Sequence, residues 1–255
     1  MLEKLKKNQF LFEELVKRDF KIKYKGTWLG VVWSVLQPLL MFLVMRTIFL
    51  EFFGRTMEHY TIYLLSGYIV FNYFSDSTKS TMKVLRYNAK IIEKVNVPKY
   101  LFVLSRNAQG FISYLLILAV YFIFIAIDGI AFTWKFVLLL YPVLFQLLFN
   151  IGMGFILSAL YTFFRDFGYL YDVIVKFVSY MSAVFYDVER FSPTVQTGFF
   201  MNPIYCFIYY FRCITLYDTV PPLWLHVLIF CYTVLALTAG CTIYRKYNTR
   251  FLYYM

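Results

Sequence analysis

The feature that most constrains this chain is a series of long segments without Asp, Glu, Lys or Arg. They occupy residues 26–45, 59–75, 107–127, 136–164, 191–211 and 219–244, and residues 167–186 form a further one interrupted only by Asp172 and Lys176. About 20 apolar residues in a helix cross the hydrocarbon core of a bilayer. The sequence therefore predicts an all-α integral membrane protein, with residues 1–255 as a single domain.

Composition supports a membrane protein over a soluble enzyme. Of the 255 residues, 61% are hydrophobic and 15% are charged, whereas soluble domains carry about 25% charged residues. The net charge of +11 would suit a nucleic-acid partner, but the basic residues lie between the apolar segments. In that position they orient a chain in the bilayer, so we expect membrane association and no nucleic acid.

The basic residues also predict the topology. Of the 25 Lys and Arg residues, 20 fall in the N-terminal segment, residues 79–106, residues 165–176 and the C-terminal tail. The positive-inside rule assigns these four regions to the cytoplasm. Both termini are then cytoplasmic, which requires an even number of spans.

Seven apolar segments must therefore be reduced to six. Residues 191–211 are the segment to exclude, because Pro193, Asn202 and Pro203 interrupt the internal hydrogen bonding that a lipid-facing helix needs. We expect six transmembrane helices, with an outer re-entrant segment over residues 188–217 between spans five and six. Residues 8–24, with apolar side chains along one helical face, predict an amphipathic helix in the inner interface.

Little in the sequence indicates chemistry on this chain. None of the 11 glycines begins a GxxxxGK[ST] loop that would hold ATP phosphates. Neither His59 nor His226 has a partner at metal-ligand spacing, and the four cysteines form no CxxC. We therefore expect no catalytic residue, no metal site and no cofactor on this chain. Asp172 and Lys176, four residues apart on one helical face, either neutralise each other or lie at the cytoplasmic end and reach water.

The 24 Tyr and 30 Phe residues exceed what two interfacial belts need. Aromatic faces stack on the apolar faces of sugar rings, and Tyr hydroxyls bond sugar hydroxyls, so a channel for a carbohydrate is one use for them. The alternative is that most of these rings face lipid or fill the core.

A resemblance extends this interpretation. The stretch RDFKIKYKGTWLGVVWSVLQPLL, residues 18–40, resembles the entry signature of the polysaccharide-exporting branch of the ABC-2 type transporter permeases. Further similarities follow in the same order along the chain. They are Ile92–Pro98 with the coupling segment between spans two and three, Phe164-Arg165-Asp166 after span four, Asn202-Pro203 in the outer region, and the tail from Tyr244.

The resemblance implies a homodimer that encloses a channel in the bacterial cytoplasmic membrane. Two copies of a separate ABC ATPase would bind ATP and Mg²⁺ beneath it and drive a lipid-linked glycan outward. The family exports O-antigens, capsules, teichoic acids and rhamnose-rich polymers.

Two sets of site residues follow from these considerations. For ATPase coupling, within a cytoplasmic coupling helix over residues 88–100, we expect Asn88, Lys90, Glu93, Lys94 and Pro98; the alternative is a solvated loop that binds anionic lipid. For the wall of the substrate channel, helical spacing in spans one and five selects Trp33, Gln37, Met41, Tyr180 and Phe185.

Two other functions stay open at this point. One is an ABC-2 exporter of drugs or small lipids, against which the Trp28-Leu29-Gly30 to Gln37-Pro38 signature and the aromatic content argue. The other is a membrane-embedded lipid-linked sugar transferase, which would need clustered acidic residues, whereas the 14 Asp and Glu residues are scattered.

Overall fold

The computed structural model describes residues 8–24, 30–53, 59–94, 97–248 and 250–254. Nearly all of these residues are helical and none lies in a β-strand, which confirms the predicted all-α class. The longer helices are α3 (Gly30–Phe53), α4 (Tyr60–Met82), α7 (Tyr100–Ile127), α8 (Leu140–Phe163), α9 (Phe167–Met181) and α12 (Leu223–Tyr247). The shorter elements are α2 (Gln9–Tyr24), α5 (Val84–Tyr87), α6 (Ala89–Lys94), η1 (Trp134–Leu139), η2 (Val188–Arg190), α10 (Pro193–Phe199), α11 (Pro203–Thr215) and α13 (Phe251–Tyr254).

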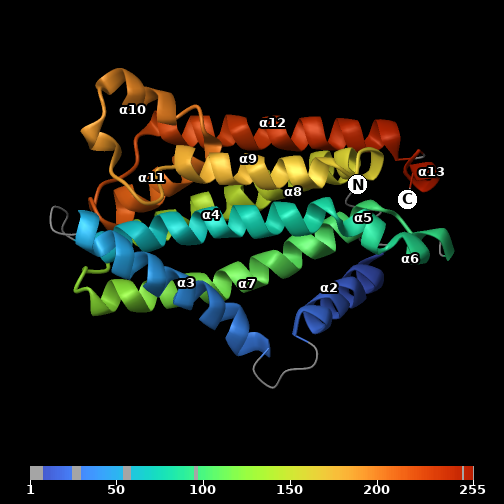
Figure 1. The fold of residues 1–255 in the computed structure, drawn as a ribbon, viewed down its shortest axis with the longest axis horizontal. Helices are drawn as coiled ribbons and strands as arrows, with labels where there is room; N and C mark the ends of the chain where they lie inside the picture. The colour runs from blue at the N-terminus through green and yellow to red at the C-terminus, as the bar shows by residue number, and fades with distance from the viewer. Residues whose placement is uncertain (1–7, 25–29, 54–58, 95–96, 249, 255) are drawn as a thin grey trace.

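The long helices form a bundle with two different ends (Figure 1). Helices α4, α7, α8, α9 and α12 run along the longest axis of the molecule, and α3 runs at an angle beside α4 and α7. Helices α10 and α11 lie at one end of the bundle, which we call the α11 end. Helices α5, α6 and α13 lie at the other, the α6 end, and α2 packs on α7 near it.

Three helices of the described chain are long and apolar enough to cross a membrane. They comprise Tyr100–Ile127, Trp134–Phe163 and Leu223–Tyr247. Each contains most of one predicted uncharged segment: 107–127, 136–164 and 219–244 respectively. The predicted segments at 59–75 and 167–186 lie largely on α4 and α9, and the segment at 26–45 lies on α3 except for residues 26–29, which are outside the described residues.

The expected re-entrant segment, residues 188–217, folds into short helices whose starts the sequence encodes. At the start of α11, the Asn202 side chain accepts a hydrogen bond from the Ile204 amide at 3.0 Å, and Pro203 occupies the first helical position. Within α11, every residue from Ile204 to Thr215 except Tyr209 is buried. The segment thus packs inside the bundle end, where α11 contacts α4, η1 and α12.

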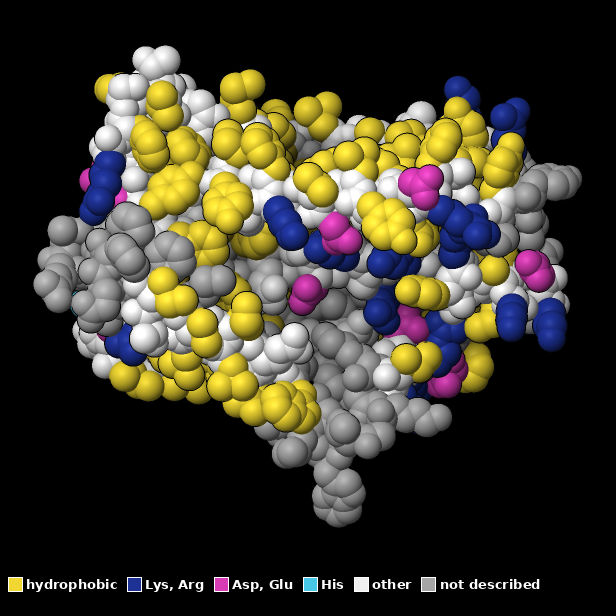
Figure 2. Space-filling view, in the orientation of Figure 1, with side chains coloured by type: hydrophobic (Ala, Val, Ile, Leu, Met, Phe, Trp, Pro, Cys, Tyr) yellow, Lys and Arg dark blue, Asp and Glu magenta, His cyan; other side chains and the backbone are white. Residues whose placement is uncertain are grey.

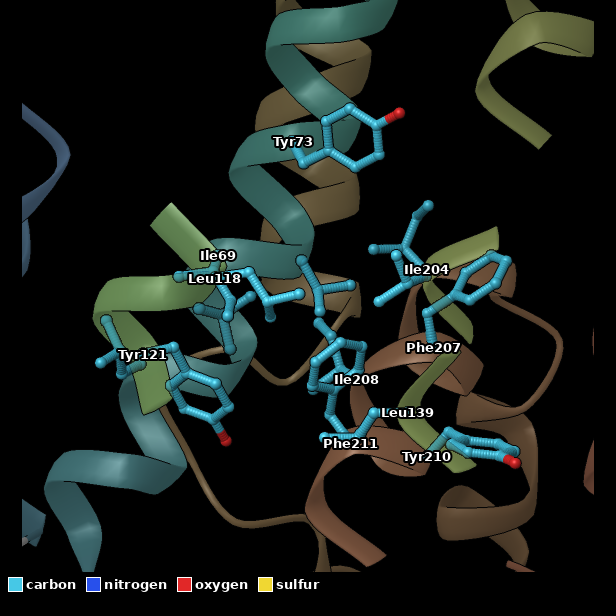
Figure 3. Packing of buried hydrophobic residues seen from close by; sticks show 14 of the residues in the cluster. Ile69, Tyr73, Leu118, Tyr121, Leu139, Ile204, Phe207, Ile208, Tyr210 and Phe211 are labelled. Carbon is cyan, nitrogen blue, oxygen red and sulfur yellow. The ribbon is translucent and has the colours of Figure 1, made fainter. Parts of the chain in front are cut away.

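The main hydrophobic core lies where α11 meets the long helices. Figure 3 shows side chains of α4, α7, η1 and α11 meeting there, among them Ile69, Leu118, Leu139 and Ile208. A second cluster, which we call the inner core, occupies the α6 end. Its fully buried members are Leu15, Val84, Leu85, Ile92, Leu101, Phe102, Val103, Phe155, Ala159, Tyr244 and Phe251.

A buried cation joins α11 to α4. Arg212 is 2% exposed, and its guanidinium carbon lies 3.5 Å from the centroid of the Tyr63 ring. Its Nη1 donates to the Tyr63 hydroxyl at 2.8 Å and its Nη2 to the Ala183 carbonyl at 2.9 Å. A Cβ at Gly67 would lie 2.9 Å from that Nη2, so only glycine leaves room for the guanidinium.

Helices α8 and α12 pack against each other through glycine. A Cβ added at Gly152 of α8 would lie 2.5 Å from the carbonyl carbon of Ala236 in α12, and a Cβ at Gly240 would collide with the Gly152 carbonyl oxygen. Small residues at such positions let helix backbones approach closely, as in membrane helix pairs.

We expect Gly152→Ala to destabilise the protein by about 1–3 kcal/mol, because the added methyl group forces the two backbones apart. The measurement is the midpoint of thermal unfolding of the purified protein in detergent. Gly198→Ala in α10 is the matched control, since its Cβ would meet nothing within 4 Å. Equal midpoints for the two variants would contradict the close packing of α8 on α12.

Candidate functional site

A groove of about 640 Å³ opens between α3, α4 and α7. The α4 and α7 residues that line it recur every three or four positions, so each helix presents one face to the groove. From α4 and the residues after it these are Tyr68, Ile69, Asn72, Tyr73, Asp76, Ser77, Lys79, Ser80, Lys83 and Tyr87. From α7 they are Arg106, Gln109, Gly110, Ser113, Tyr114 and Ile117, and from α3 Gln37 and Met41.

The polarity of the groove changes along its length. Because α4 runs towards the α6 end and α7 runs away from it, Lys83 and Arg106 lie at the α6 end of the groove. At its α11 end the lining is apolar or aromatic, with Ile69 from α4 and Ile117 from α7. The groove is thus amphipathic, basic at one end and apolar at the other.

Charged side chains mark the same face of the molecule. Figure 2 shows Lys, Arg, Asp and Glu side chains across the middle of this face and towards the α6 end, with hydrophobic side chains along its borders. Three basic residues and one acidic residue, Asp76, line the groove itself. Among the described residues, neither Lys83 nor Arg106 has an ion-pair partner, so the groove has an excess of positive charge.

Lys79 of the groove forms an ion pair with a residue of α9. Its Nζ lies 2.7 Å from Oδ1 of Asp172 on α9. The sequence left open whether Asp172 and Lys176 neutralise each other or lie at the cytoplasmic end and reach water. In the structure α9 packs on α4, and the ion pair of Asp172 is with Lys79. Both side chains are about half exposed, as expected for a pair that water can reach.

Hydrogen bonds behind the groove hold α4 to α7. The Ser77 hydroxyl donates to Oδ1 of Asn107 at 2.8 Å, and Nδ2 of Asn107 bonds the Thr81 hydroxyl at 3.3 Å. On the groove wall, the rings of Tyr73 and Tyr114 stack with centroids 4.2 Å apart. These contacts make α4 and α7 one wall.

Two of the five residues predicted to line the channel lie in the groove, and three lie outside it. Gln37 and Met41 line the groove. Trp33, one turn earlier on α3, is half-exposed outside its lining, and Tyr180 is exposed at the end of α9. Phe185 packs on the main core, and its carbonyl accepts a hydrogen bond from the Tyr60 hydroxyl at 2.9 Å.

Most polar residues of the groove were missed from sequence. Asn72, Asp76, Lys79 and Lys83 recur every three or four residues, a pattern that predicts a polar helix face. The uncharged segments do not reveal this pattern, because the segment at 59–75 ends before Asp76. The same applies to Arg106, which immediately precedes the segment at 107–127.

The residues predicted to couple to an ATPase lie around α6. That helix is shorter than the predicted segment 88–100: it covers Ala89–Lys94, and residues 95–96 are outside the described part. Lys90, Glu93 and Lys94 are exposed on it. Asn88 is instead buried, and its Nδ2 donates to the Val84 carbonyl at 2.8 Å. Pro98 is half-buried just before α7.

Residues near the C-terminus accept hydrogen bonds from both flanks of α6. Nη2 of Arg86, before α6, donates to the Tyr254 carbonyl at 2.9 Å, and Nζ of Lys99, after α6, donates to the Asn248 carbonyl at 2.8 Å. Burial lowers the pKa of Lys99. Phe251 is fully buried in the inner core. Hydrogen bonds on both flanks therefore fix α6 relative to α12 and α13.

No metal-binding cluster is present in the part of the chain that the structure describes: no three His, Cys, Asp or Glu side chains there could hold an ion together. The arrangement supports binding and movement of a molecule along a groove, with a polar helix exposed at one end.

Comparison with known proteins places the chain among transport proteins. The ABC-2 type transporter family matches residues 11–216. An O-antigen export system permease protein RfbA from Klebsiella pneumoniae is 26% identical over 249 residues, which cover 95% of each chain. A protein of the same name from Myxococcus xanthus is 25% identical over 179 residues, which cover 70% of this chain and 69% of the relative.

The Lys79–Asp172 pair tests whether the groove face meets water. A double-mutant cycle with Lys79→Gln and Asp172→Asn should give a coupling energy of about 0.2–1 kcal/mol, as for exposed pairs. Unfolding in bicelles is the measurement, and the exposed Lys17–Glu14 pair of α2, 3.0 Å apart, is the reference. If the face met lipid, either single variant would leave a lone charge at a cost of about 2.5–3.5 kcal/mol, and that result would reject a hydrated groove.

Proposed function

This chain belongs to the ABC-2 type transporter family, and on that premise we propose that it is the permease subunit of a polysaccharide exporter. It moves a lipid-linked cell-surface glycan outward across the bacterial cytoplasmic membrane. A separate ATPase subunit binds ATP and Mg²⁺ and supplies the energy. The observation that carries this proposal is the amphipathic groove, which offers a basic end and an apolar end along one helix-lined wall.

The proposed topology has six spans: α3, α4, α7, α8, α9 and α12. Helix α9 has 15 residues and is therefore about 22 Å long, less than the roughly 30 Å of the hydrocarbon core. Helices α10 and α11 occupy the remaining thickness of the hydrocarbon core, as a re-entrant segment in the outer leaflet. The α6 end is then cytoplasmic, together with both termini, and α2 lies in the inner interface.

The groove face argues for a second copy of this chain. Charged side chains such as Lys79 and Asp172 are half-exposed on a face that lies between membrane-spanning helices. Hydrocarbon is a poor environment for them. A homodimer that turns these faces towards each other would enclose a hydrated path, with Gln37 and Met41 on its wall.

The basic end of the groove suits the anionic headgroup of a lipid-linked glycan. Lys83 and Arg106 form no ion pair among the described residues, and Gln109 beside them has a second amide N–H besides the one that bonds Ser113. Charge-assisted hydrogen bonds to phosphate oxygens are the strong ones in proteins. The apolar end of the groove accommodates part of the lipid chain.

We expect Arg106→Gln to weaken headgroup binding about ten- to a hundredfold, the effect of losing a hydrogen bond to a charged group. Glycan at the cell surface should fall, while the amount of assembled transporter stays the same. Arg165→Gln is the matched control, because Arg165 is exposed between α8 and α9 and does not line the groove. Normal export by the Arg106 variant would remove this residue from the substrate path.

The ATPase docks on α6 in this proposal. Lys90, Glu93 and Lys94 form an exposed polar face, while Ile92 anchors the helix in the inner core. The hydrogen bonds from Arg86 and Lys99 to the C-terminal residues hold α6 in place when the ATPase exerts force on it. Movement of α6 is therefore passed to α4, α7 and α12.

We expect Glu93→Lys to abolish export and to weaken ATPase binding by about 2–5 kcal/mol, because the reversal places a like charge or an unpaired charge in the docked interface. Co-purification of the ATPase from membranes measures this. Glu13→Lys, the same reversal at an exposed position of α2, is the control and should retain the ATPase. Equal recovery of the ATPase with both variants would contradict docking at α6.

A further inference from the structure

A second, smaller cavity lies at the α11 end, away from the groove. It has a volume of about 120 Å³ and is lined by residues from the start of α4, from η2 and its flank, and from α11. The lining residues that matter here are Tyr63, Asp187, Glu189, Tyr209, Arg212 and Tyr217. None of them lines the groove, so the cavity is a separate feature.

A residue that lines the cavity has a hydrogen-bond donor without an acceptor. Nε of Arg212 is buried and has no partner among the described residues, although Nη1 and Nη2 are both engaged. A buried donor of this kind needs an acceptor from a bound molecule or from water. Arg212 is 2% exposed and lines the cavity, so a molecule bound in the cavity would lie against this side chain.

Two carboxylates face the same space. Oδ1 of Asp187 accepts a hydrogen bond from the Glu189 amide at 3.0 Å, which leaves its second oxygen available. The Glu189 side chain is exposed at the rim. The lining therefore combines a cationic side chain, two anionic acceptors and the hydroxyls of Tyr209 and Tyr217, which can both donate and accept.

Aromatic rings form the remaining wall. The Phe200 and Tyr209 rings pack edge to face with centroids 5.2 Å apart, and Tyr205 lies 5.9 Å from Tyr209 in a stacked arrangement. Tyr209 is the only residue of α11 between Ile204 and Thr215 that is not buried. Its ring offers an apolar surface beside the charged side chains of the cavity.

These features select one class of ligand. The two carboxylates repel an anion, the guanidinium repels a cation, and an apolar molecule would cover the remaining carboxylate oxygens without giving them hydrogen bonds. A neutral polyhydroxylated ring satisfies the set, because its hydroxyls accept from Arg212 and donate to the carboxylates while its C–H face covers an aromatic ring. We propose that this cavity binds a single neutral sugar unit.

The size and place of the cavity agree with this ligand. At roughly 30 Å³ per water molecule, 120 Å³ corresponds to about four waters, which suits one partly inserted ring rather than a disaccharide. The inference rests on the proposed function, since α10 and α11 then lie on the outer side. The site would hold the glycan where it leaves the membrane.

The test uses the full-length permease in nanodiscs and saturation-transfer NMR with free sugars. The probes are galactose, mannose, rhamnose and N-acetylglucosamine as neutral rings, with glucosamine as a cation and glucuronate as an anion. We expect at least one neutral sugar to show saturation transfer and the charged sugars to bind more weakly. Glu189→Gln should weaken that binding about tenfold, as expected for one hydrogen bond to a charged group.

Asp218→Asn is the matched control, because this outer carboxylate pairs with Lys135 at 2.8 Å and does not line the cavity. It should leave sugar binding unchanged. The absence of saturation transfer from all neutral sugars, stronger binding of a charged one, or equal effects of the two variants would overturn the inference. Failure of an ATPase to co-purify would instead reject the proposed function, and the sugar titration is independent of that result.

Discussion

The organisation of the α11 end depends on one buried guanidinium that forms no ion pair with a carboxylate of the described residues. Arg212 is held by the hydroxyl of Tyr63 and by the carbonyls of Ala183 and Val184, all neutral acceptors. Ala183 adopts a left-handed conformation, with φ of 48°, to present its carbonyl. A buried charge is stable only when its hydrogen bonds are made. The chain after α9 must therefore return to α4, and the path of α10 and α11 follows from that.

Both ends of the bundle combine apolar packing with hydrogen bonds. At the α11 end, the main hydrophobic core surrounds α11, and hydrogen bonds from Arg212 connect α11, α4 and the segment after α9. At the α6 end, the inner core joins α2, α5, α6, α7, α8, α12 and α13. Hydrogen bonds from Arg86 and Lys99 fix α6 relative to the C-terminal residues. The end that the proposal assigns to the ATPase is thus one packed unit, so a displacement of α6 is shared by the helices around it.

The sequence predicted the fold more fully than the site. Uncharged segments correctly placed residues 107–127 and 136–164 on long helices, because apolar length is a property of one segment alone. The partner of Asp172 could not be predicted in this way, since Lys79 reaches it only through the packing of α9 on α4. Arg212 was likewise missed, because its role depends on a tyrosine ring and two carbonyls distant in the chain.

The inner core also determines when the protein can become native. Its buried members extend from Leu15 to Phe251. Leu15 therefore cannot make all of its native contacts until the helices between these two residues have been synthesised and inserted. Contacts between residues so far apart in sequence form slowly, because closing the loop between them is entropically costly. Until Phe251 arrives, Ile92 has an incomplete apolar pocket. A half-synthesised chain therefore has no complete inner core, and the α6 end can finish folding only after the C-terminal residues have been synthesised.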